Sequence, residues 1–409
     1  MIVLQVNKFH FIKGGADRYY LEVSRLLRQA GHDVVHLAMA HPRNEPAGQD
    51  DAFVEEVDYH ASRSPWQALR VASRLVYNGE TARLVRRMAA VRKPAVAHLH
   101  NVYHQLSLSV VRELDRQGIP VVMTLHDYKP VCPAYLLMTG GKICERCRGG
   151  RFYHAAVHRC NLESLSASLV ASLEAYVHRM AGTYGRVAVY LCPSRFLLEK
   201  VRELGLRAPA LRQINYPLLL DRYAPAYGGP PVLIYAGRLS REKGIATLLD
   251  AARRQGVGKG WTLRILGEGP LRETMEAQVA AWGLEGAIRF EGYLTGDGLL
   301  EAVREARAVV VPSEWYENQP YAVLEAFALG KPVIGSRIGG IPEMVEDGVT
   351  GWTFPAGDPE ALGASIREAL DGPERAAELG RTARRRVEER HDPREHVAQL
   401  LGIYEEVRS

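Results

Sequence analysis

The feature that most constrains the fold is a repeated alternation of short apolar segments with longer segments of helical periodicity. Ile2–Val6, Val96–Leu99 and Pro120–Thr124 are almost continuously apolar and lack the polar alternation of a half-exposed strand. Such strands are typical of parallel sheets that helices cover on both faces. Residues 20–30 repeat apolar side chains at helical spacing, and Gly31 marks the end of that helix. The sequence therefore predicts a parallel α/β architecture.

The alternation occurs in two arrays separated by an irregular stretch. Residues 215–231 are rich in Tyr, Pro and Gly, which is typical of a linker, and a new array begins with the apolar strand Val232–Ala236. We therefore expect an α/β fold with two Rossmann-like, doubly wound domains facing across a cleft. The expected segments are an N-terminal domain (1–215), a linker (216–231), a C-terminal domain (232–392) and a C-terminal helix (393–409) that packs back on the N-terminal domain.

Composition excludes several classes of protein. The chain has 409 residues, of which 47% are hydrophobic and 24% charged, as in an ordinary globular protein. No apolar run reaches the ~18–20 residues that span a bilayer. The net charge of +5 is small and dispersed, so we expect no nucleic-acid partner. Met1–Val6 has no basic region before its apolar run, so we expect no signal peptide and a cytoplasmic location.

The densest group of candidate site residues follows the apolar strand Ala308–Val311. Pro320 stands where a helix would begin and Gly330 where it would end. The amino terminus of such a helix favours an anion such as phosphate. Glu317 lies just before this turn, and Glu325 lies on the helix itself. The alternative is that Glu317 only interacts favourably with the helix dipole and that Glu325 is a solvated surface residue.

The loop after the strand Val232–Ala236 carries two cations, Arg238 and Lys243, between glycines. Cations at the carboxyl end of a strand suit a diphosphate, because charge-assisted hydrogen bonds compensate its charge. A basic surface loop is the simpler alternative. The sequence contains no Asp-x-Asp motif, so we expect no metal at the diphosphate and no cofactor for catalysis.

Four motifs in sequence order together resemble a known family. They are Gly237-Arg238-x4-Lys243-Gly244, Gly267-Glu268-Gly269-Pro270, Phe290-Glu291-Gly292-Tyr293 and Glu317-x7-Glu325. They resemble the C-terminal half of retaining glycosyltransferases of the GT-B fold, and most of all family 4 (glycosyl transferases group 1). The loop Gly14–Tyr19 and the segment His126-Asp127-Tyr128 resemble the first half of the same family, so the resemblance spans nearly the whole chain.

The resemblance implies roles for individual residues. His126 would touch the donor sugar from the N-terminal domain, and Glu317 would hold that sugar near its reacting face. The residues implied in binding the donor nucleotide, its diphosphate or its sugar are Gly15, Arg238, Lys243, Leu294, Asn318, Gln319, Tyr321 and Glu325. Asn318-Gln319-Pro320 stands where many members carry Gly-aromatic-Gly, which leaves the identity of the sugar open.

The implied activity is transfer of a sugar by a hexosyltransferase-type enzyme. It would move the sugar from a nucleotide-diphosphate sugar to a polysaccharide, glycolipid or small-molecule hydroxyl, with retention of configuration. A lipid-linked acceptor would place the protein at the inner face of the membrane, and the basic helical segment 83–93 is compatible with peripheral membrane contact. The alternatives are a GT-B-fold sugar-nucleotide epimerase or phosphorylase, and a non-catalytic nucleotide-sugar-binding protein.

Four of the five cysteines lie in one glycine-containing segment, at about residues 128–162: Cys132, Cys144, Cys147 and Cys160. A Cys-x2-Cys pair flanked by two further cysteines favours thiolate ligation of a metal over disulfides where no secretion signal is present. The sequence therefore predicts a structural zinc site, with unligated thiols as the alternative. The fifth residue, Cys192, ends an apolar strand, so we expect it in the core.

Three histidines, His98, His100 and His104, surround the end of the strand Val96–Leu99. The pair His100 and His104 has a spacing that permits metal binding, but no third ligand is evident. We therefore expect one or two of these rings to line the cleft as polar contacts.

Overall fold

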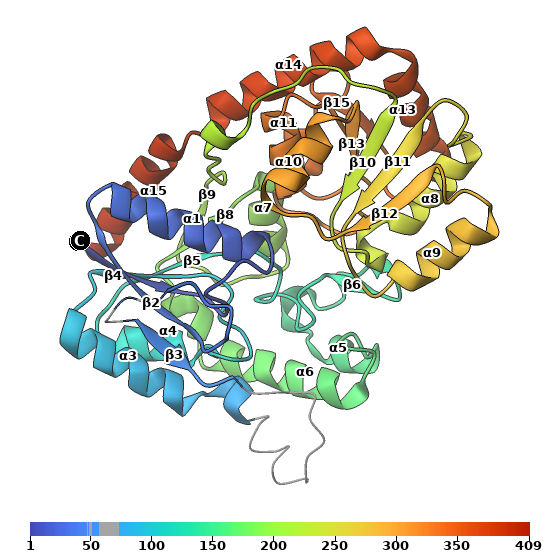
Figure 1. Ribbon diagram of the computed structural model, residues 1–409. Coiled ribbons are helices and arrows are strands. Elements are labelled where there is room, and N and C mark those ends of the chain that lie inside the picture. Colours follow the sequence, from blue (N-terminus) through green and yellow to red (C-terminus); the bar gives the residue numbers. More distant parts are fainter. Residues whose placement is uncertain (47, 49–50, 57–72) are drawn as a thin grey trace. The chain divides into compact units, whose positions relative to one another are not determined.

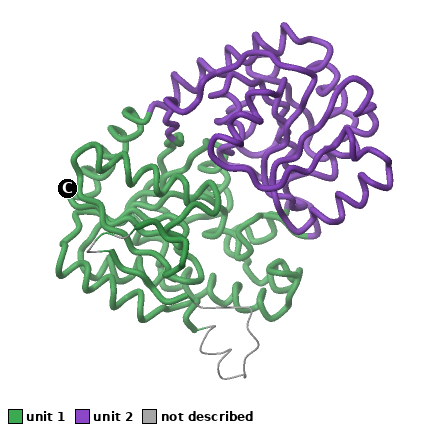
Figure 2. The backbone as a smooth tube through the Cα atoms, in the orientation of Figure 1, with its two compact units in different colours: residues 1–139, 144–216, 393–409 green, residues 140–143, 217–392 purple. Residues whose placement is uncertain are grey.

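A computed structural model of the chain describes residues 1–46, 48, 51–56 and 73–409 (Figure 1). The chain divides into two compact units (Figure 2). Unit 1 contains Met1–Thr139, Cys144–Tyr216 and Pro393–Ser409, and unit 2 contains Gly140–Ile143 and Pro217–Asp392. The segment from residue 393 onward therefore belongs to the same unit as residue 1.

Unit 1 is built on a parallel sheet, which in the described part of the chain has seven strands in the order β3-β2-β1-β4-β5-β8-β9. Strand β1 lies between β2 and β4, and its Leu4 pairs with Val35 on one side and Ala97 on the other. The strands are β1 (Ile2–Val6), β2 (Asp33–Met39), β3 (Ala52–Val54), β4 (Val96–Leu99), β5 (Val121–Thr124), β8 (Val189–Cys192) and β9 (Leu211–Gln213). A two-stranded hairpin of β6 (Met138–Thr139) and β7 (Lys142–Ile143) follows β5 in the sequence.

Helices connect the strands of unit 1, and short polar side chains fix where several of them begin. Asn78 accepts hydrogen bonds from the N–H groups of Glu80 and Thr81, and Ser194 accepts one from that of Leu197. The helices are α1 (Gly15–Gln29), α3 (Gly79–Arg92), α4 (Ser109–Arg116), α5 (Tyr153–Val157), α6 (Leu165–Met180), α7 (Arg195–Glu203) and α15 (Pro393–Arg408). Helix α15 packs against α1 and β4.

Unit 2 has a parallel sheet of six strands among the described residues, in the order β12-β11-β10-β13-β14-β15. They are β10 (Val232–Ala236), β11 (Thr262–Leu266), β12 (Ile288–Gly292), β13 (Ala308–Val311), β14 (Val333–Ser336) and β15 (Gly351–Phe354). The helices are α8 (Ile245–Arg254), α9 (Arg272–Ala281), α10 (Gly296–Arg304), α11 (Tyr321–Ala328), α12 (Ile341–Met344), α13 (Pro359–Asp371) and α14 (Pro373–Arg390) (Figure 1).

Apolar side chains of the sheet and its helices form the core of unit 2. Leu233, Leu263 and Ile265 are fully buried there, together with Leu248 of α8 and Leu362 of α13. This burial explains why the strands are continuously apolar, because a strand covered on both faces has no side that water stabilises. Two parallel α/β units confirm the predicted fold class.

The strand order fixes where a ligand site belongs in each unit. In unit 1 the chain moves outward from β1 through β2 to β3, then returns to the other side of β1 with β4. In unit 2 the same reversal occurs between β10 and β13. The crevice outside the carboxyl ends of the strands at such a reversal is the usual ligand site of open α/β sheets.

Among the described residues, the structure has no helix that combines the length and the apolar character needed to cross a bilayer.

Candidate functional site

The loops after β10 and β13 meet at the reversal point of unit 2, because these two strands are direct neighbours in the sheet. The N–H of Glu314 donates a hydrogen bond of 2.9 Å to the carbonyl O of Glu242. Gly244 has a φ of +68°, and a Cβ atom there would overlap the carbonyl O of Pro312. Only glycine combines this left-handed conformation with so close an approach of the two loops.

The central contact of these loops is an ion pair between Lys243 and Glu317. Lys243 Nζ lies 2.6 Å from Glu317 Oε1, and Ser313 Oγ donates a hydrogen bond of 2.7 Å to the same oxygen. Burial acts to raise the pKa of Glu317, but the charge of Lys243 and the hydrogen bonds outweigh it and hold that pKa below its usual value. Glu317 is therefore a buried, ionised carboxylate that faces a lysine at neutral pH.

The backbone of Glu317 is held from the loop after β14. The N–H of Gly340 donates a hydrogen bond of 2.7 Å to the carbonyl O of Glu317. Gly339 has a φ of +61°, and a Cβ atom there would overlap the same carbonyl oxygen. Sequence reasoning assigned no role to Ser313, Gly339 or Gly340, although a Gly-Gly pair after a buried strand was an available signal.

The other residues implied in donor binding also lie after strands of unit 2. Arg238 is exposed, and its carbonyl O accepts a hydrogen bond of 2.7 Å from Tyr235 Oη. Leu294 follows β12, two strands from β10. Asn318 and Gln319 are buried between β13 and α11, Tyr321 is the first residue of α11, and Glu325 on α11 accepts a hydrogen bond of 3.2 Å from Tyr223 Oη.

No side chain caps the amino terminus of α11, whose N-cap is Pro320. This terminus lies directly after the loop that holds Glu317. An uncapped helix start carries positive partial charge, which suits an anionic ligand group. The carboxyl edge of unit 2 thus combines two cations, an ionised carboxylate and a helix amino terminus.

Gly15 lies at the corresponding edge of unit 1, as the first residue of α1 after β1. The carboxylate of Asp17 holds this turn, because it accepts hydrogen bonds from the N–H of Gly14 at 3.1 Å and from Asn7 Nδ2 at 2.9 Å. Gly15 itself is exposed, so the backbone of the turn is open to a ligand.

His126 follows β5 at the same edge, and hydrogen bonds orient its ring. His126 Nδ1 lies 2.8 Å from Tyr216 Oη, and His126 Nε2 lies 3.2 Å from His100 Nδ1. His100 Nε2 in turn lies 2.8 Å from Gln5 Oε1. Burial lowers the pKa of His126 to about 3 and that of His100 well below its usual value, so both rings are neutral.

These contacts assign the proton positions in the chain of rings. Gln5 Oε1 can only accept, so His100 carries its proton on Nε2 and accepts at Nδ1. His126 then donates from Nε2 and accepts the hydroxyl proton of Tyr216 at Nδ1. Sequence reasoning gave Tyr216 no role, since it lies 90 residues from His126 in the chain.

Asp127 lies beside His126 at this edge. Burial raises the pKa of its carboxyl group to about 6, although the N–H of Lys129 donates a hydrogen bond of 2.9 Å to Oδ1. Lys129 Nζ forms a buried ion pair of 2.8 Å with Glu174 Oε2.

The comparisons with known proteins match both halves of the chain. The family model "Glycosyl transferase 4-like domain" matches residues 14–217, and the model "Glycosyl transferases group 1" matches residues 221–386. Both matches agree with the two α/β units. The chain is a GT-B glycosyltransferase. This confirms the family that the sequence motifs indicated.

Relatives of this glycosyltransferase resemble it over nearly its full length. It is 28% identical to a glycogen synthase of Mycobacterium tuberculosis over 402 residues, which are 91% of this chain and 86% of the relative. It is 27% identical to an alpha-maltose-1-phosphate synthase of Mycolicibacterium smegmatis, covering 97% of this chain and 96% of the relative.

Solved structures have the same fold. Sucrose-phosphate synthase of Thermosynechococcus elongatus matches with a TM-score of 0.73 and 21% identity, covering 99% of this chain and 98% of that one. Anabaena HepE in complex with UDP and glucose matches with a TM-score of 0.72 and 16% identity, covering 99% and 100%.

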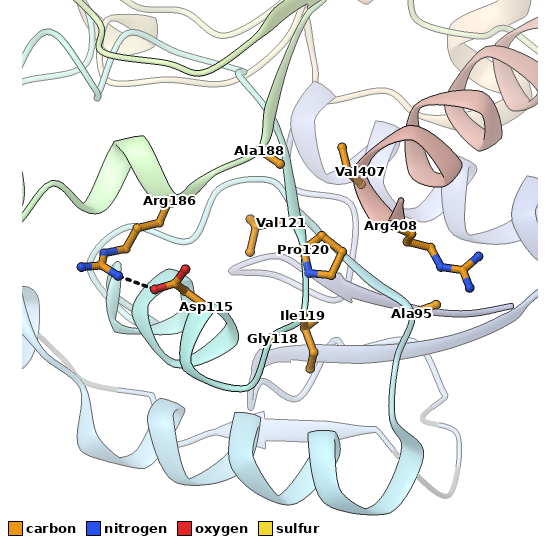
Figure 3. A pocket seen from close by; sticks show the side chains of 10 residues that line it. All are labelled: Ala95, Asp115, Gly118, Ile119, Pro120, Val121, Arg186, Ala188, Val407 and Arg408. Atoms are coloured by element: carbon orange, nitrogen blue, oxygen red, sulfur yellow. Dashed lines mark hydrogen bonds and ion pairs between the residues drawn. The ribbon is translucent and has the colours of Figure 1, made fainter.

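A cavity of about 410 Å³ in this glycosyltransferase lies away from these residues (Figure 3). Ala95, Pro120 and Ala188 line it from the amino ends of β4, β5 and β8, whereas Gly15 and His126 follow the carboxyl ends of strands. An ion pair of Arg186 with Asp115 stands at its side. The cavity is therefore at the opposite edge of the sheet and is not the candidate site.

Among the described residues, one trio of potential metal ligands has its ligand atoms within 4.8 Å of one another: His10, His36 and Asp51. Both ring nitrogens of His36 are already engaged, Nδ1 with Tyr20 Oη at 2.7 Å and Nε2 with Arg28 Nη2 at 2.7 Å. The cation of Arg28 opposes a metal ion at this place, so the trio is part of a hydrogen-bond network.

Proposed function

We propose that this glycosyltransferase moves a sugar from a nucleotide-diphosphate sugar to a hydroxyl of a polysaccharide, glycolipid or small molecule. The observation that carries the proposal is the ion pair between half-buried Lys243 and buried Glu317 at the reversal point of unit 2, with Arg238 in the same loop as Lys243. Among the relatives are a glycogen synthase and an alpha-maltose-1-phosphate synthase, and HepE is a complex with UDP-glucose in one solved structure. UDP-glucose is therefore the first donor to test.

In this proposal the diphosphate of the donor replaces Glu317 as the partner of Lys243. The diphosphate competes for Lys243 and is also bound by Arg238 and the amino terminus of α11, which together supply positive charge without a metal ion. Glu317 is then released from Lys243 and accepts hydrogen bonds from the hydroxyl groups of the sugar. Glu325 binds the ribose, as the family resemblance implies.

The residues of unit 1 serve the reacting end of the sugar and the acceptor in the same proposal. His126 contacts the sugar as a neutral ring that Tyr216 and His100 hold in orientation. The family resemblance favours retention of configuration, with the leaving phosphate taking the proton of the acceptor hydroxyl. The bond from the anomeric carbon to phosphate breaks, and the bond from that carbon to the acceptor oxygen forms on the same face.

The test is transfer by purified protein from a panel of nucleotide sugars, with release of the nucleotide diphosphate measured with and without acceptor sugars. We expect Glu317→Gln to lower kcat by roughly a hundredfold, which is typical for loss of one preorganised electrostatic contact. Glu314→Gln is the matched control, because Glu314 lies in the same loop but its carboxylate accepts a hydrogen bond from Thr247 Oγ1. Wild-type transfer by Glu317→Gln would refute the assignment.

The same assay separates the alternative activities. A transferase releases the nucleotide diphosphate in proportion to acceptor. An epimerase consumes donor without acceptor, and a phosphorylase requires inorganic phosphate. A binding protein shifts its melting temperature with nucleotide sugars but does not turn them over.

We also propose that unit 1 contacts an anionic membrane at the cytoplasmic face, which would give access to a lipid-linked acceptor. The basic helix α3 is a weak basis for this, because Arg86 pairs with Glu113 at 3.1 Å and Arg92 with Asp33 at 2.7 Å. A better one is an apolar stripe on α6 and the residues before it, 49–69% exposed and at helical spacing: Leu162, Leu165, Leu169 and Leu173.

Two arginines, Arg146 and Arg151, lie in the sequence before this stripe and complement an anionic bilayer. Burial and the charges of Arg151, His158 and Arg146 lower the pKa of His154 on α5, so the two arginines lie near this ring. An apolar stripe with adjoining cations is typical of a surface that inserts at the headgroup level of anionic lipid.

Sedimentation with phosphatidylserine-containing vesicles tests this contact. We expect binding to anionic vesicles and little to phosphatidylcholine vesicles. The variant Leu169→Glu/Leu173→Glu should lose binding, while Val91→Glu, which changes an exposed apolar residue on α3, should retain it. Equal sedimentation of both variants would overturn the proposed surface.

A further inference from the structure

The segment after β5 contains a cluster of four cysteines that the proposed reaction does not use. All five cysteines of the chain are free thiols. Cys132 and Cys147 are buried, and Cys144 and Cys160 are half-buried. Cys192 is buried at the end of β8, as the sequence predicted.

The four thiols lie in the same part of unit 1. Cys147 lies within the range of electrostatic interaction with Cys132, Cys144 and Cys160. Cys160 likewise lies within the range of electrostatic interaction with Cys144, and Cys132 lies within that range of Cys160. Cys147 and Cys160 also contact the same small apolar cluster of Phe152, Ala155 and Ala175. The cluster is therefore a local gathering of four sulfur atoms in three dimensions, as well as in sequence.

The segment that carries these thiols has little regular structure to hold it. The strands β6 and β7 have two residues each, and α5 has five. Several residues without the freedom of glycine adopt positive φ angles here: Tyr135, Leu137, Arg159, Leu162 and Glu163. Each such residue costs about 1 kcal/mol, so a segment of this kind needs a strong local constraint.

The chemistry of the donor set selects the ligand. Four thiolates in a tetrahedral set prefer Zn²⁺ or an iron–sulfur cluster over Mg²⁺ or Ca²⁺, which prefer oxygen. Four thiolates around Zn²⁺ carry a net charge of −2, and Arg146 Nη1 already donates a hydrogen bond of 3.5 Å to Cys144 Sγ. This cation offsets part of the negative charge, and its hydrogen bond to a ligand sulfur helps to orient that ligand.

No three of the four sulfur atoms lie within 4.8 Å of one another, whereas Zn–S bonds of about 2.3 Å require separations of about 3.8 Å. Binding must therefore draw the sulfur atoms inward. Cys144 and Cys147 stand in a loop next to Gly149 and Gly150, both at positive φ, and Cys160 stands in the turn between α5 and α6. These positions can shift without disturbing the main sheet of unit 1.

We propose that Cys132, Cys144, Cys147 and Cys160 bind one Zn²⁺ ion as a tetrahedral thiolate site. The site ties the loop after β5 to the turn between α5 and α6. Its role is structural, because all four protein ligands close the coordination sphere and leave no position for substrate. It does not depend on the proposed transfer reaction.

The test is the metal content of full-length protein purified under reducing conditions without chelators. We expect about one zinc and almost no iron per chain by ICP-MS, as for a closed structural site. Cys147→Ser and Cys160→Ser should lose zinc, while Cys192→Ser should retain it. Cobalt substitution should give the intense charge-transfer absorption of thiolate ligands.

Because a cysteine variant can fail to fold, a second measurement uses the wild-type chain. Removal of zinc by a strong chelator should expose the insert to limited proteolysis between residues 128 and 162, and added zinc should restore protection. Folded protein with substoichiometric zinc and four readily titrated thiols would overturn the site. Iron with labile sulfide, or two disulfides in non-reduced protein, would overturn the zinc assignment.

Discussion

The hydroxyl group of Tyr216 makes the sharpest single test of the site in unit 1. Tyr216→Phe removes one oxygen atom, which lies 2.8 Å from His126 Nδ1, and leaves the ring in place. The His126 nitrogen then loses its donor within a half-buried site. An unsatisfied buried acceptor costs about 1–3 kcal/mol, so we expect a loss of unfolding free energy in this range.

The effect on catalysis follows from the proton positions. With Tyr216 present, Nδ1 of His126 accepts, and the ring proton sits on Nε2 facing His100. Without the Tyr216 hydroxyl only the contact with His100 still favours the Nε2–H form, so the Nδ1–H form becomes more accessible and the ring can tilt more easily. We expect kcat to fall about tenfold, equal to about 1.4 kcal/mol, with a smaller change in KM for the donor. Nitrogen chemical shifts of His126 should show a mixture of tautomers.

Tyr190→Phe is the matched control. Tyr190 is a buried residue of the same unit, and its Oη donates a hydrogen bond of 2.7 Å to the carbonyl O of Tyr184. The two variants should lose similar stability, but only Tyr216→Phe should change kcat and the tautomer of His126. Equal kcat values for both variants would refute the positioning role of Tyr216.

Two further predictions concern stability. Burial lowers the pKa of His36 to about 2 and that of His126 to about 3, so the unfolded chain binds protons at these rings below its ordinary pKa of about 6.5 while the folded chain does not. Stability should therefore fall as pH drops from 6.5, by up to about 1.4 kcal/mol per pH unit for each ring; urea unfolding at pH 7 and 5.5 measures this, and equal midpoints would contradict it. Lys129→Met leaves the buried carboxylate of Glu174 without its cation and should cost about 3–5 kcal/mol, with much of the loss recovered in Lys129→Met/Glu174→Leu. A double variant no more stable than Lys129→Met in thermal unfolding would speak against this account.

The sequence predicted the fold because strands that are buried on both faces of a sheet are continuously apolar in sequence. Ile2–Val6 and Val232–Ala236 were expected as strands and are β1 and β10 with the same bounds. Other bounds were less exact, since Pro120–Thr124 was expected as a strand and β5 spans Val121–Thr124. Gly351–Phe354, the edge strand β15, is short and gives no separate signal.

The sequence did not predict which side chains contact each other between neighbouring strands of the sheet. Lys243 and Glu317 were both expected at the donor, but their ion pair depends on β13 returning to lie beside β10, 74 residues later. Tyr216 reaches His126 through a similar long-range contact. Spacing within a motif carries local geometry, whereas contacts between motifs depend on strand order, which no single segment encodes.

The place of α15 has a consequence for how this protein is made. Tyr404 Oη on α15 lies 2.7 Å from His98 Nδ1, and His396 Nε2 lies 3.2 Å from Tyr19 Oη. The sheet of unit 1 is synthesised first but is completed only when the last helix emerges from the ribosome, after residues 217–392 of unit 2 have been translated. A chain that stops after Asp392 would retain every strand of unit 2 and yet expose apolar surface on unit 1, so premature termination should produce an aggregation-prone product.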